Sequence, residues 1–244
     1  MYINTMGLVL RETKYKESSK ILTVLTAETG KLTVSARGAM RKNSKLAAAT
    51  QLLVFSEMTL FHNRDRWTLT EARSFEQFTG LRYDIEKLAL GSYIAELAEA
   101  VADEDSPNPD LLPLCLNTLY ALSEDIKEIA LIKPAFELRL MAITGYTPLV
   151  SHCEVCGNEE PETALLNLTG GTIRCEKCSA YEGVRLSSSS LQAVKYIISC
   201  DPKKLLSFNL KGEALRELSS VAEGYLLTQL DRKFRTLEFF KGIQ

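Results

Sequence analysis

The sequence is poor in histidine and tryptophan and contains no long apolar run. Among its 244 residues are two histidines and one tryptophan. No apolar stretch approaches the roughly 18 residues that a membrane-spanning helix needs. The N-terminal segment also lacks the basic and apolar parts of a signal peptide. These absences predict a cytoplasmic protein without a membrane partner.

Sequence motifs for catalysis are missing as well. Neither the phosphate-binding loop G-x-x-x-x-G-K-[ST] nor the dinucleotide-binding loop G-x-G-x-x-G occurs. His62 and His152 have no nucleophile partner that the sequence reveals. The acidic residues 103–105 lie beside two prolines, which is typical of a solvated loop. We therefore expect a protein that is not an enzyme and has no catalytic residues.

The charged residues are distributed unevenly, although the net charge is only −2. Residues 1–80 hold 12 Lys and Arg against 7 Asp and Glu, whereas residues 81–150 hold 5 against 12. Residues 151–244 hold 12 of each. A basic part beside an acidic part predicts modules with different partners. The basic part favours nucleic acid, but a solvated face without a ligand has the same charge.

The first 80 residues have the pattern of short β-strands. Ile21–Thr26 is rich in β-branched residues, and apolar and polar residues alternate over Leu32–Ala36. The turn signal at residues 28–31 indicates that these two strands form a hairpin. Further strands are expected at residues 52–61 and 67–70, with a turn at residues 62–65. Several short strands in one segment predict a small antiparallel barrel or sandwich.

From residue 81 onward the apolar residues follow a helical period. Leu90, Ile94, Leu97 and Val101 form a stripe along one face of a helix. Pro134 either kinks a later helix or marks its start. The further helices are predicted at residues 111–122, 126–144, about 188–199, and through residues 215–226. The fold class is therefore α+β, with a β module over residues 1–80 and a helical part over residues 81–244.

Four cysteines carry the strongest chemical signal. Cys153 and Cys156 form one C-x2-C pair, Cys175 and Cys178 form another, and 18 residues separate the pairs. This spacing is typical of a tetrahedral zinc site, and four thiolates leave no open position for catalysis. We predict a structural Zn²⁺, with four independent thiols or a redox dithiol as the alternatives. His152 is expected to flank this site as a solvated side chain.

Two further cysteines have no partner in the sequence. Cys115 falls in an apolar helix and is expected to be a small core residue. Cys200 ends a predicted helix, and no feature of the sequence assigns it a role.

A second signal is a band of cations in the β module. One group clusters around the first turn, before residue 21, and the other follows the strand predicted at Leu32–Ala36. The second group includes Gly38 and small residues that let a phosphate approach the backbone. Such contacts give affinity for nucleic acid without reading its sequence. Tyr15 is a candidate for base stacking, whereas Phe55, Phe61 and Trp67 are expected to fill the barrel core. The candidate DNA-binding residues are Arg11, Lys14, Tyr15, Lys16, Arg37, Arg41, Lys42 and Lys45.

The sequence resembles the RecO family of bacterial recombination mediators nearly from end to end, more weakly after residue 182. The segments that carry the resemblance are 7–11 with Tyr15 and Glu17, 21–26, 29–31, 36–39 with Arg41 and Ser44, 81–84, 93–97, 136–140, and 145–148 before the cysteines, with Gly170 and Gly171 between the cysteine pairs. Two positions depart from the family pattern. Lys16 stands where the family usually has glycine, and the segment before Phe55 lacks a proline that many members carry.

The resemblance implies an N-terminal OB-fold barrel over residues 1–80, followed by a helical domain over residues 81–244. A zinc-finger-like insert lies at about residues 150–182. Members of the family bind single- and double-stranded DNA and anneal complementary strands. With RecR, and with RecF in many bacteria, they help to load RecA onto DNA coated by single-strand-binding protein (SSB), whose acidic C-terminal tail they bind. The resemblance thus implies a nucleoid-associated role in the cytoplasm.

Two other functions remain open at this point. The chain is compatible with a zinc-ribbon regulator that binds nucleic acid with sequence preference. It is also compatible with an adaptor whose basic face contacts only an acidic protein. Arg232, Lys233 and Arg235 form an alternative patch for DNA or a protein partner.

Overall fold

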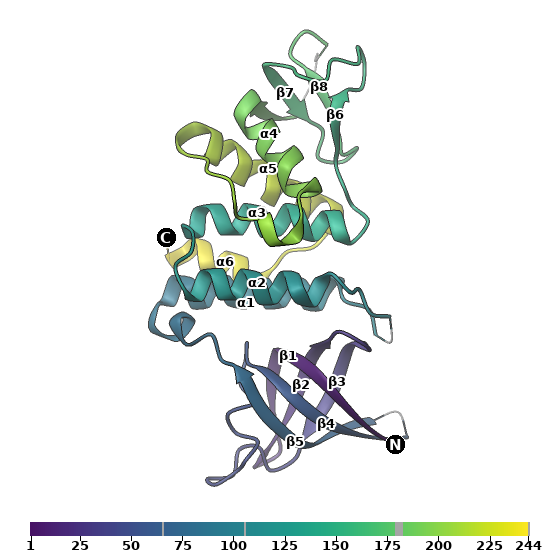
Figure 1. Cartoon of the computed structure of the whole chain (residues 1–244), viewed down its shortest axis with the longest axis vertical. Helices are drawn as coiled ribbons and strands as arrows, with labels where there is room; N and C mark the ends of the chain where they lie inside the picture. The colour runs from purple at the N-terminus through teal and green to yellow at the C-terminus, as the bar shows by residue number, and fades with distance from the viewer. Residues whose placement is uncertain (65, 105, 179–182, 244) are drawn as a thin grey trace. The chain divides into compact units, whose positions relative to one another are not determined.

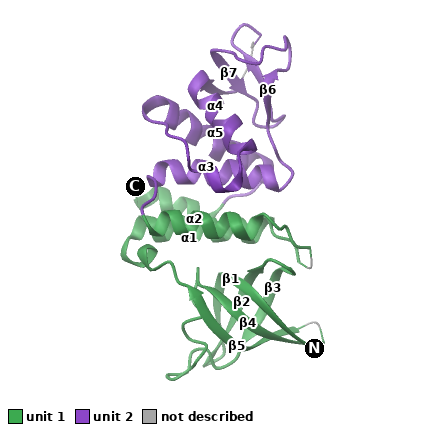
Figure 2. Cartoon of the chain, in the orientation of Figure 1, with its two compact units in different colours: residues 1–124, 234–244 green, residues 125–233 purple. Residues whose placement is uncertain are grey.

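The computed structural model describes residues 1–64, 66–104, 106–178 and 183–243. The chain divides into two compact units (Figure 2). Unit 1 comprises residues 1–124 and 234–244, and unit 2 comprises residues 125–233. Among the described residues, none of the helices is both long and apolar enough to cross a membrane. The predicted boundary between residues 80 and 81 stays a prediction.

Unit 1 begins with a closed barrel of five strands (Figure 1). Its strands are β1 (Tyr2–Tyr15), β2 (Ser19–Thr26), β3 (Gly30–Ala36), β4 (Phe55–Asn63) and β5 (Arg66–Glu76). They close in the order β1-β2-β3-β5-β4. Neighbouring strands are antiparallel, except that β3 and β5 run parallel. The barrel confirms the expected fold class, together with the helices and the cysteine cluster described below.

The barrel core follows from the alternation in the sequence. In β3, Leu32, Val34 and Ala36 are buried, and the polar residues between them face outward. The antiparallel hairpin of β2 and β3 is therefore confirmed. The expected turn at residues 62–65 is displaced, because β4 continues through Asn63. Asp65 of that turn lies outside the described residues.

Three α-helices and one short 3-10 helix complete the described part of unit 1. Helix α1 (Ile85–Val101) begins at Asp84, whose carboxylate accepts hydrogen bonds from two amides of the first turn. The short 3-10 helix η1 (Thr79–Tyr83) precedes it, and α2 (Leu111–Ser123) follows the loop predicted at residues 103–109. Asp105 in that loop lies outside the described residues. Helix α6 (Arg235–Ile243) was not predicted from the sequence, and it packs against α1.

Unit 2 combines helices with a four-stranded sheet. The helices are α3 (Ile129–Ile143), α4 (Ser188–Ser199), η2 (Pro202–Lys204) and α5 (Gly212–Leu230). The strands are β6 (Leu149–Cys153), β7 (Thr163–Leu166), β8 (Thr172–Cys175) and β9 (Val184–Ser187), in the order β6-β8-β7-β9. Helix α3 begins three residues later than predicted and runs through Pro134. Residues 179–182 of the predicted insert lie outside the described residues.

Candidate functional site

The turn between β1 and β2 positions the first group of cations. Lys14 lies opposite Lys20, and Tyr15 lies opposite Ser19, at the end of the antiparallel pair. Lys16 occupies the turn with a φ of 57°, in the left-handed region that favours glycine. Lys16 carries a side chain at this position and therefore holds a strained conformation. It adds a charge at the tip of the turn.

The loop of residues 37–54 brings the second group of cations to the same place. The amide of Met40 donates to the carbonyl of Ser18 at 3.0 Å. The amide of Gly38 donates to Oγ of Ser19 at 3.3 Å. These two bonds join the loop to the β1–β2 turn, so cations more than 20 residues apart in the sequence lie in adjoining segments. No pattern in the sequence predicted the roles of Ser18 and Ser19.

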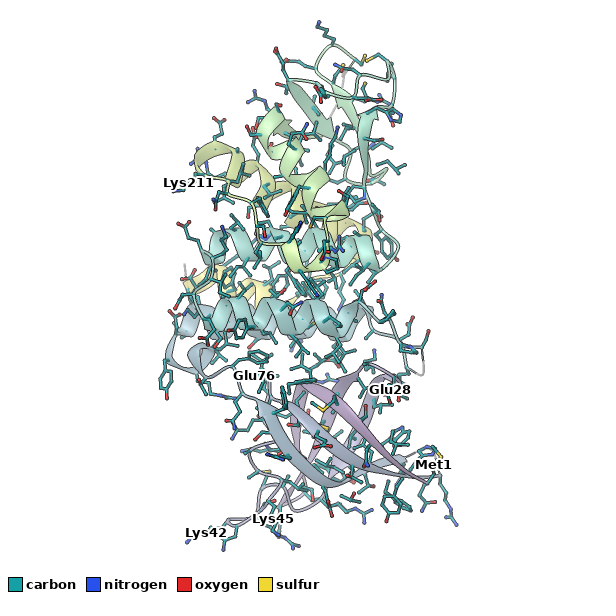
Figure 3. All side chains as sticks on the ribbon, viewed as in Figure 1. Met1, Glu28, Lys42, Lys45, Glu76 and Lys211 are labelled. Carbon is teal, nitrogen blue, oxygen red and sulfur yellow. The ribbon has the colours of Figure 1, made fainter. Side chains whose placement is uncertain are left out.

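All eight candidate DNA-binding residues are exposed. We call their surface, formed by the end of β1 and the loop of residues 37–54, the basic surface. In Figure 3, Lys42 and Lys45 lie on this loop at the far side of the barrel from α1. Within the described parts of the chain, six of its cations form no ion pair with a carboxylate. These six are Lys14, Lys16, Arg37, Arg41, Lys42 and Lys45.

Arg11 differs from the other cations because α1 supplies a partner for it. Its guanidinium lies 2.7 Å from the Glu99 carboxylate. Lys31 also contacts this part of the chain, since its Nζ donates to the Glu99 carbonyl at 3.0 Å. The acidic segment after residue 80 thus packs against one side of the basic module. A phosphate at Arg11 would have to compete with Glu99.

The aromatic residues of the barrel divide into two kinds. Tyr15 is 47% exposed, and Nζ of Lys16 lies 5.4 Å from its ring centroid. Trp67 packs, partly buried, against the barrel core. The prediction that Phe55 and Phe61 fill this core is wrong. Both lie outside the core cluster, and their rings contact the exposed rings of Phe75 and Tyr2.

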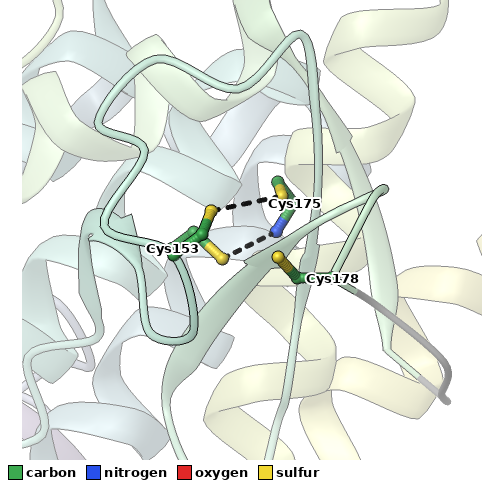
Figure 4. A group of neighbouring side chains, drawn as sticks. Cys153, Cys175 and Cys178 are labelled. Atoms are coloured by element: carbon green, nitrogen blue, oxygen red, sulfur yellow. Dashed lines mark hydrogen bonds between the residues drawn. The ribbon is translucent and has the colours of Figure 1, made fainter.

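The four predicted metal ligands lie together in unit 2. Their sulfur atoms are all within 4.8 Å of one another. Cys153 ends β6 and Cys175 ends β8, so the sheet presents one cysteine of each pair. Figure 4 shows the thiols of Cys153, Cys175 and Cys178 gathered between these strand ends. After the first pair, Gly157 turns the chain with a φ of 74°, and its amide donates to the Cys153 carbonyl at 2.9 Å.

The cysteine cluster has the dimensions of a tetrahedral zinc site. Zn–S bonds of about 2.3 Å in a tetrahedron separate the sulfurs by about 3.8 Å. Sγ of Cys156 lies 3.8 Å from Sγ of Cys175, a separation too long for a disulfide. The donor set is also suitable, because four thiolates are typical ligands of structural zinc.

The local hydrogen bonds shift the pKa values of Cys153 and Cys178 in opposite directions. Burial would raise the pKa of Cys153, but backbone donors, including the Cys175 amide 3.3 Å from its sulfur, outweigh burial and lower this pKa to about 6. Hydrogen bonds with Cys156 and Cys175 raise the pKa of Cys178 to about 12. One thiol is therefore ready to ionise while a neighbour keeps its proton.

Cys115 and His152 have the surroundings that the sequence predicted. Cys115 is fully buried, and this burial raises its pKa to about 12, which confirms it as a core residue. Cys200 ends α4 and is partly buried. His152 is exposed, and its Nδ1 lies 2.9 Å from Oγ of Ser151. Arg232, Lys233 and Arg235 are exposed as well.

Comparisons with known proteins agree over nearly the whole chain. Residues 1–78 match the family model described as Recombination protein O N terminal. Residues 82–238 match the one described as Recombination protein O C terminal. A DNA repair protein RecO from Acetivibrio thermocellus is 32% identical over 244 residues, which cover 99% of this chain and 97% of that protein. One from Alkaliphilus metalliredigens is 30% identical over 246 residues, which cover 100% of both chains.

Proposed function

The chain belongs to the RecO family of DNA repair proteins, and on this premise we propose that it is a recombination mediator that acts without catalysis. It binds single- and double-stranded DNA and anneals complementary strands. With RecR it helps to load RecA onto single-stranded DNA coated by SSB. It binds the C-terminal tail of SSB, and RecF takes part indirectly. This work takes place at the nucleoid in the cytoplasm.

The observation that carries the proposal is the basic surface. Six exposed cations without a carboxylate partner, among the residues that the structure describes, lie on two segments that are hydrogen-bonded to each other. Phosphates that bind there release counterions, which gives affinity for any sequence. Neutralised phosphates also repel a second strand less, and this lowers the barrier to annealing.

The cysteine cluster has a separate, structural role in this proposal. Cys153, Cys156, Cys175 and Cys178 would hold one Zn²⁺. Bound by these residues, the ion would link the ends of β6 and β8 with the turns that follow them and so would stabilise the sheet of unit 2. Four thiolates leave no site for a substrate, so DNA binding remains with the barrel.

The test of DNA binding is a salt titration. In the variant Arg37→Ala/Arg41→Ala/Lys42→Ala, the slope of log K against log salt should fall by about 0.7 for each phosphate of a single strand that the protein no longer neutralises, or about 2 in total. The control is Lys203→Ala/Lys204→Ala/Lys211→Ala, which removes three exposed lysines of unit 2. Its slope should equal that of the wild type. Equal slopes for all three proteins would contradict the assignment.

Two further measurements separate the alternatives. A mediator should bind oligonucleotides of different sequence with similar affinity, whereas a sequence-specific regulator should discriminate between them. The protein should also accelerate annealing of complementary strands that are each coated with SSB, and deletion of the SSB tail should abolish this acceleration. Absence of DNA binding at physiological salt would favour the adaptor with an acidic protein partner.

A further inference from the structure

A cavity of about 420 Å³ opens within the basic surface. It lies between the end of the β1–β2 pair and the loop of residues 37–54, and pockets for small ligands have volumes of about 300–1,000 Å³. Its polar lining consists of Glu12, Lys14, Lys20 and Gln51. These side chains provide two ammonium groups, a carboxylate and an amide. The cavity can therefore present hydrogen-bond donors and acceptors to a polar ligand.

The polar wall is partly fixed in place. Lys20 forms an ion pair with Glu12, and its Nζ also donates to the carbonyl of Thr50 at 3.2 Å. The side chain of Lys20 is only 15% exposed, and that of Glu12 is 33% exposed. Lys14 lies opposite Lys20 in the strand pair and is exposed. One cation thus belongs to the wall, and the other is available to a phosphate at the rim.

The rest of the lining is apolar. Ala39 is 1% exposed and belongs to the barrel core, so it fixes the bottom of the cavity in place but offers almost no surface of its own. Met40 is 37% exposed, and the hydrogen bond from its amide to Ser18 holds its backbone against the β1–β2 turn. Ala47 is exposed and is small, which leaves the cavity open. A flat apolar group fits against Met40, since methionine adapts readily to aromatic rings.

We propose that this cavity holds one unstacked nucleobase of single-stranded DNA. The inference rests on the proposed DNA binding by the basic surface and adds a contact to the base itself. The ring packs on Met40 beside Ala47, and the amide of Gln51, which can both donate and accept, hydrogen-bonds to the edge of the base. A duplex keeps its bases stacked and paired, so it uses only the phosphate contacts. The cavity therefore gives the surface a preference for single strands.

The experiment fills the cavity without changing any charge. Ala47→Phe places a ring in the opening, and Ala48→Phe is the matched control, because Ala48 is exposed on the same loop and does not line the cavity. Exclusion of one stacked base should weaken binding of a short oligothymidine by about 5- to 150-fold in Ala47→Phe. Binding of a duplex and the salt slope should not change, and Ala48→Phe should match the wild type.

A second measurement uses the unaltered protein. An oligonucleotide of the same length made of abasic sites keeps the phosphates and lacks the bases. The wild type should bind it more weakly than oligothymidine, and Ala47→Phe should bind both with similar affinity. Equal binding of both oligonucleotides by the wild type, or equal affinities of Ala47→Phe and Ala48→Phe for oligothymidine, would overturn the base pocket. Absence of all DNA binding by the wild type would instead overturn the proposed function.

Discussion

The ion pairs of Lys133 in unit 2 lead to a quantitative prediction about stability. Nζ of Lys133 lies 2.9 Å from a carboxylate oxygen of Glu137 on α3 and 2.9 Å from one of Glu223 on α5. The side chain of Lys133 is 7% exposed, and that of Glu137 is fully buried. Removal of the ammonium would leave two carboxylates facing each other without the cation that lies between them. The substitution Lys133→Met achieves this and retains most of the apolar stem.

The expected cost is large because Glu137 cannot regain water. Removing one partner of a buried ion pair destabilises proteins by about 3–5 kcal/mol, whereas replacing both partners with apolar residues is often neutral. Lys133→Met should thus lower the free energy of unfolding by about 3–5 kcal/mol, and Lys133→Met/Glu137→Leu should recover most of this stability. Since whole domains are stable by only about 5–15 kcal/mol, this effect is easily measured.

The same ion pairs predict how stability depends on pH. Burial would lower the pKa of Lys133, but the charges and hydrogen bonds of Glu137 and Glu223 outweigh burial and raise this pKa above its usual value. The stabilisation is therefore complete below the pKa of an unfolded lysine, about 10.4. It disappears as the pH rises through the higher pKa of the folded state. The difference between the wild type and Lys133→Met should shrink there.

Urea unfolding followed by circular dichroism measures these differences. Lys211→Met is the matched control, because Lys211 is exposed in unit 2 and the substitution should change stability by less than about 0.5 kcal/mol. Equal midpoints for Lys133→Met and Lys211→Met would refute the reasoning. A double variant less stable than Lys133→Met would refute it too, because the cost would then come from poorer packing.

Two further predictions concern the metal and the strained turn. Elemental analysis of protein purified without chelator should find about one zinc per chain. Cys175→Ser should release the zinc and destabilise unit 2, while the salt slope of DNA binding stays unchanged. The control Cys200→Ser should keep the metal. Lys16→Gly should relieve the backbone strain at the positive φ and so stabilise the chain by up to about 1 kcal/mol. The same substitution should lower the salt slope of DNA binding by about 0.7, because one cation is lost. The control Asp231→Gly, at a φ of 45° in unit 2, should stabilise the chain without any effect on DNA binding. If Lys16→Gly and the wild type have equal salt slopes, Lys16 does not contact DNA.

The sequence predicted those parts of the fold that depend on local patterns. Alternation over β3 and the helical stripe of α1 follow from single segments, and both are confirmed. The cysteine spacing also predicted the cluster, because each C-x2-C pair brings two sulfurs together by itself. Residues 57–60 also alternate between polar and apolar, and this alternation sets Phe61 on the same face as the exposed Glu57, which the prediction of a core residue overlooked. Pairing of β4 with β1 turns Met58 and Leu60 inward, which places Phe61 outside.

Other features depend on residues that are distant in the sequence. Glu99 pairs with Arg11 although 88 positions separate them, so the sequence alone left Arg11 among the free cations. The cavity forms only when the loop of residues 37–54 lies beside the end of the β1–β2 pair. Helix α6 is short, and its site on α1 lies about 140 residues earlier. Only the folded chain brings such groups together.

Helix α6 also makes the order of synthesis matter for unit 1. The amide and hydroxyl of Thr236 both donate to the Glu96 carboxylate, which caps the first turn of α6, and Phe234 packs edge-on against Tyr93. A ribosome delivers α1 long before it delivers these residues. During that interval Tyr93 and its neighbours remain uncovered, so the nascent chain exposes an apolar face until unit 2 has emerged. The first unit to leave the ribosome is thus the last to be completed, because α1 waits for residues that follow unit 2 in the chain.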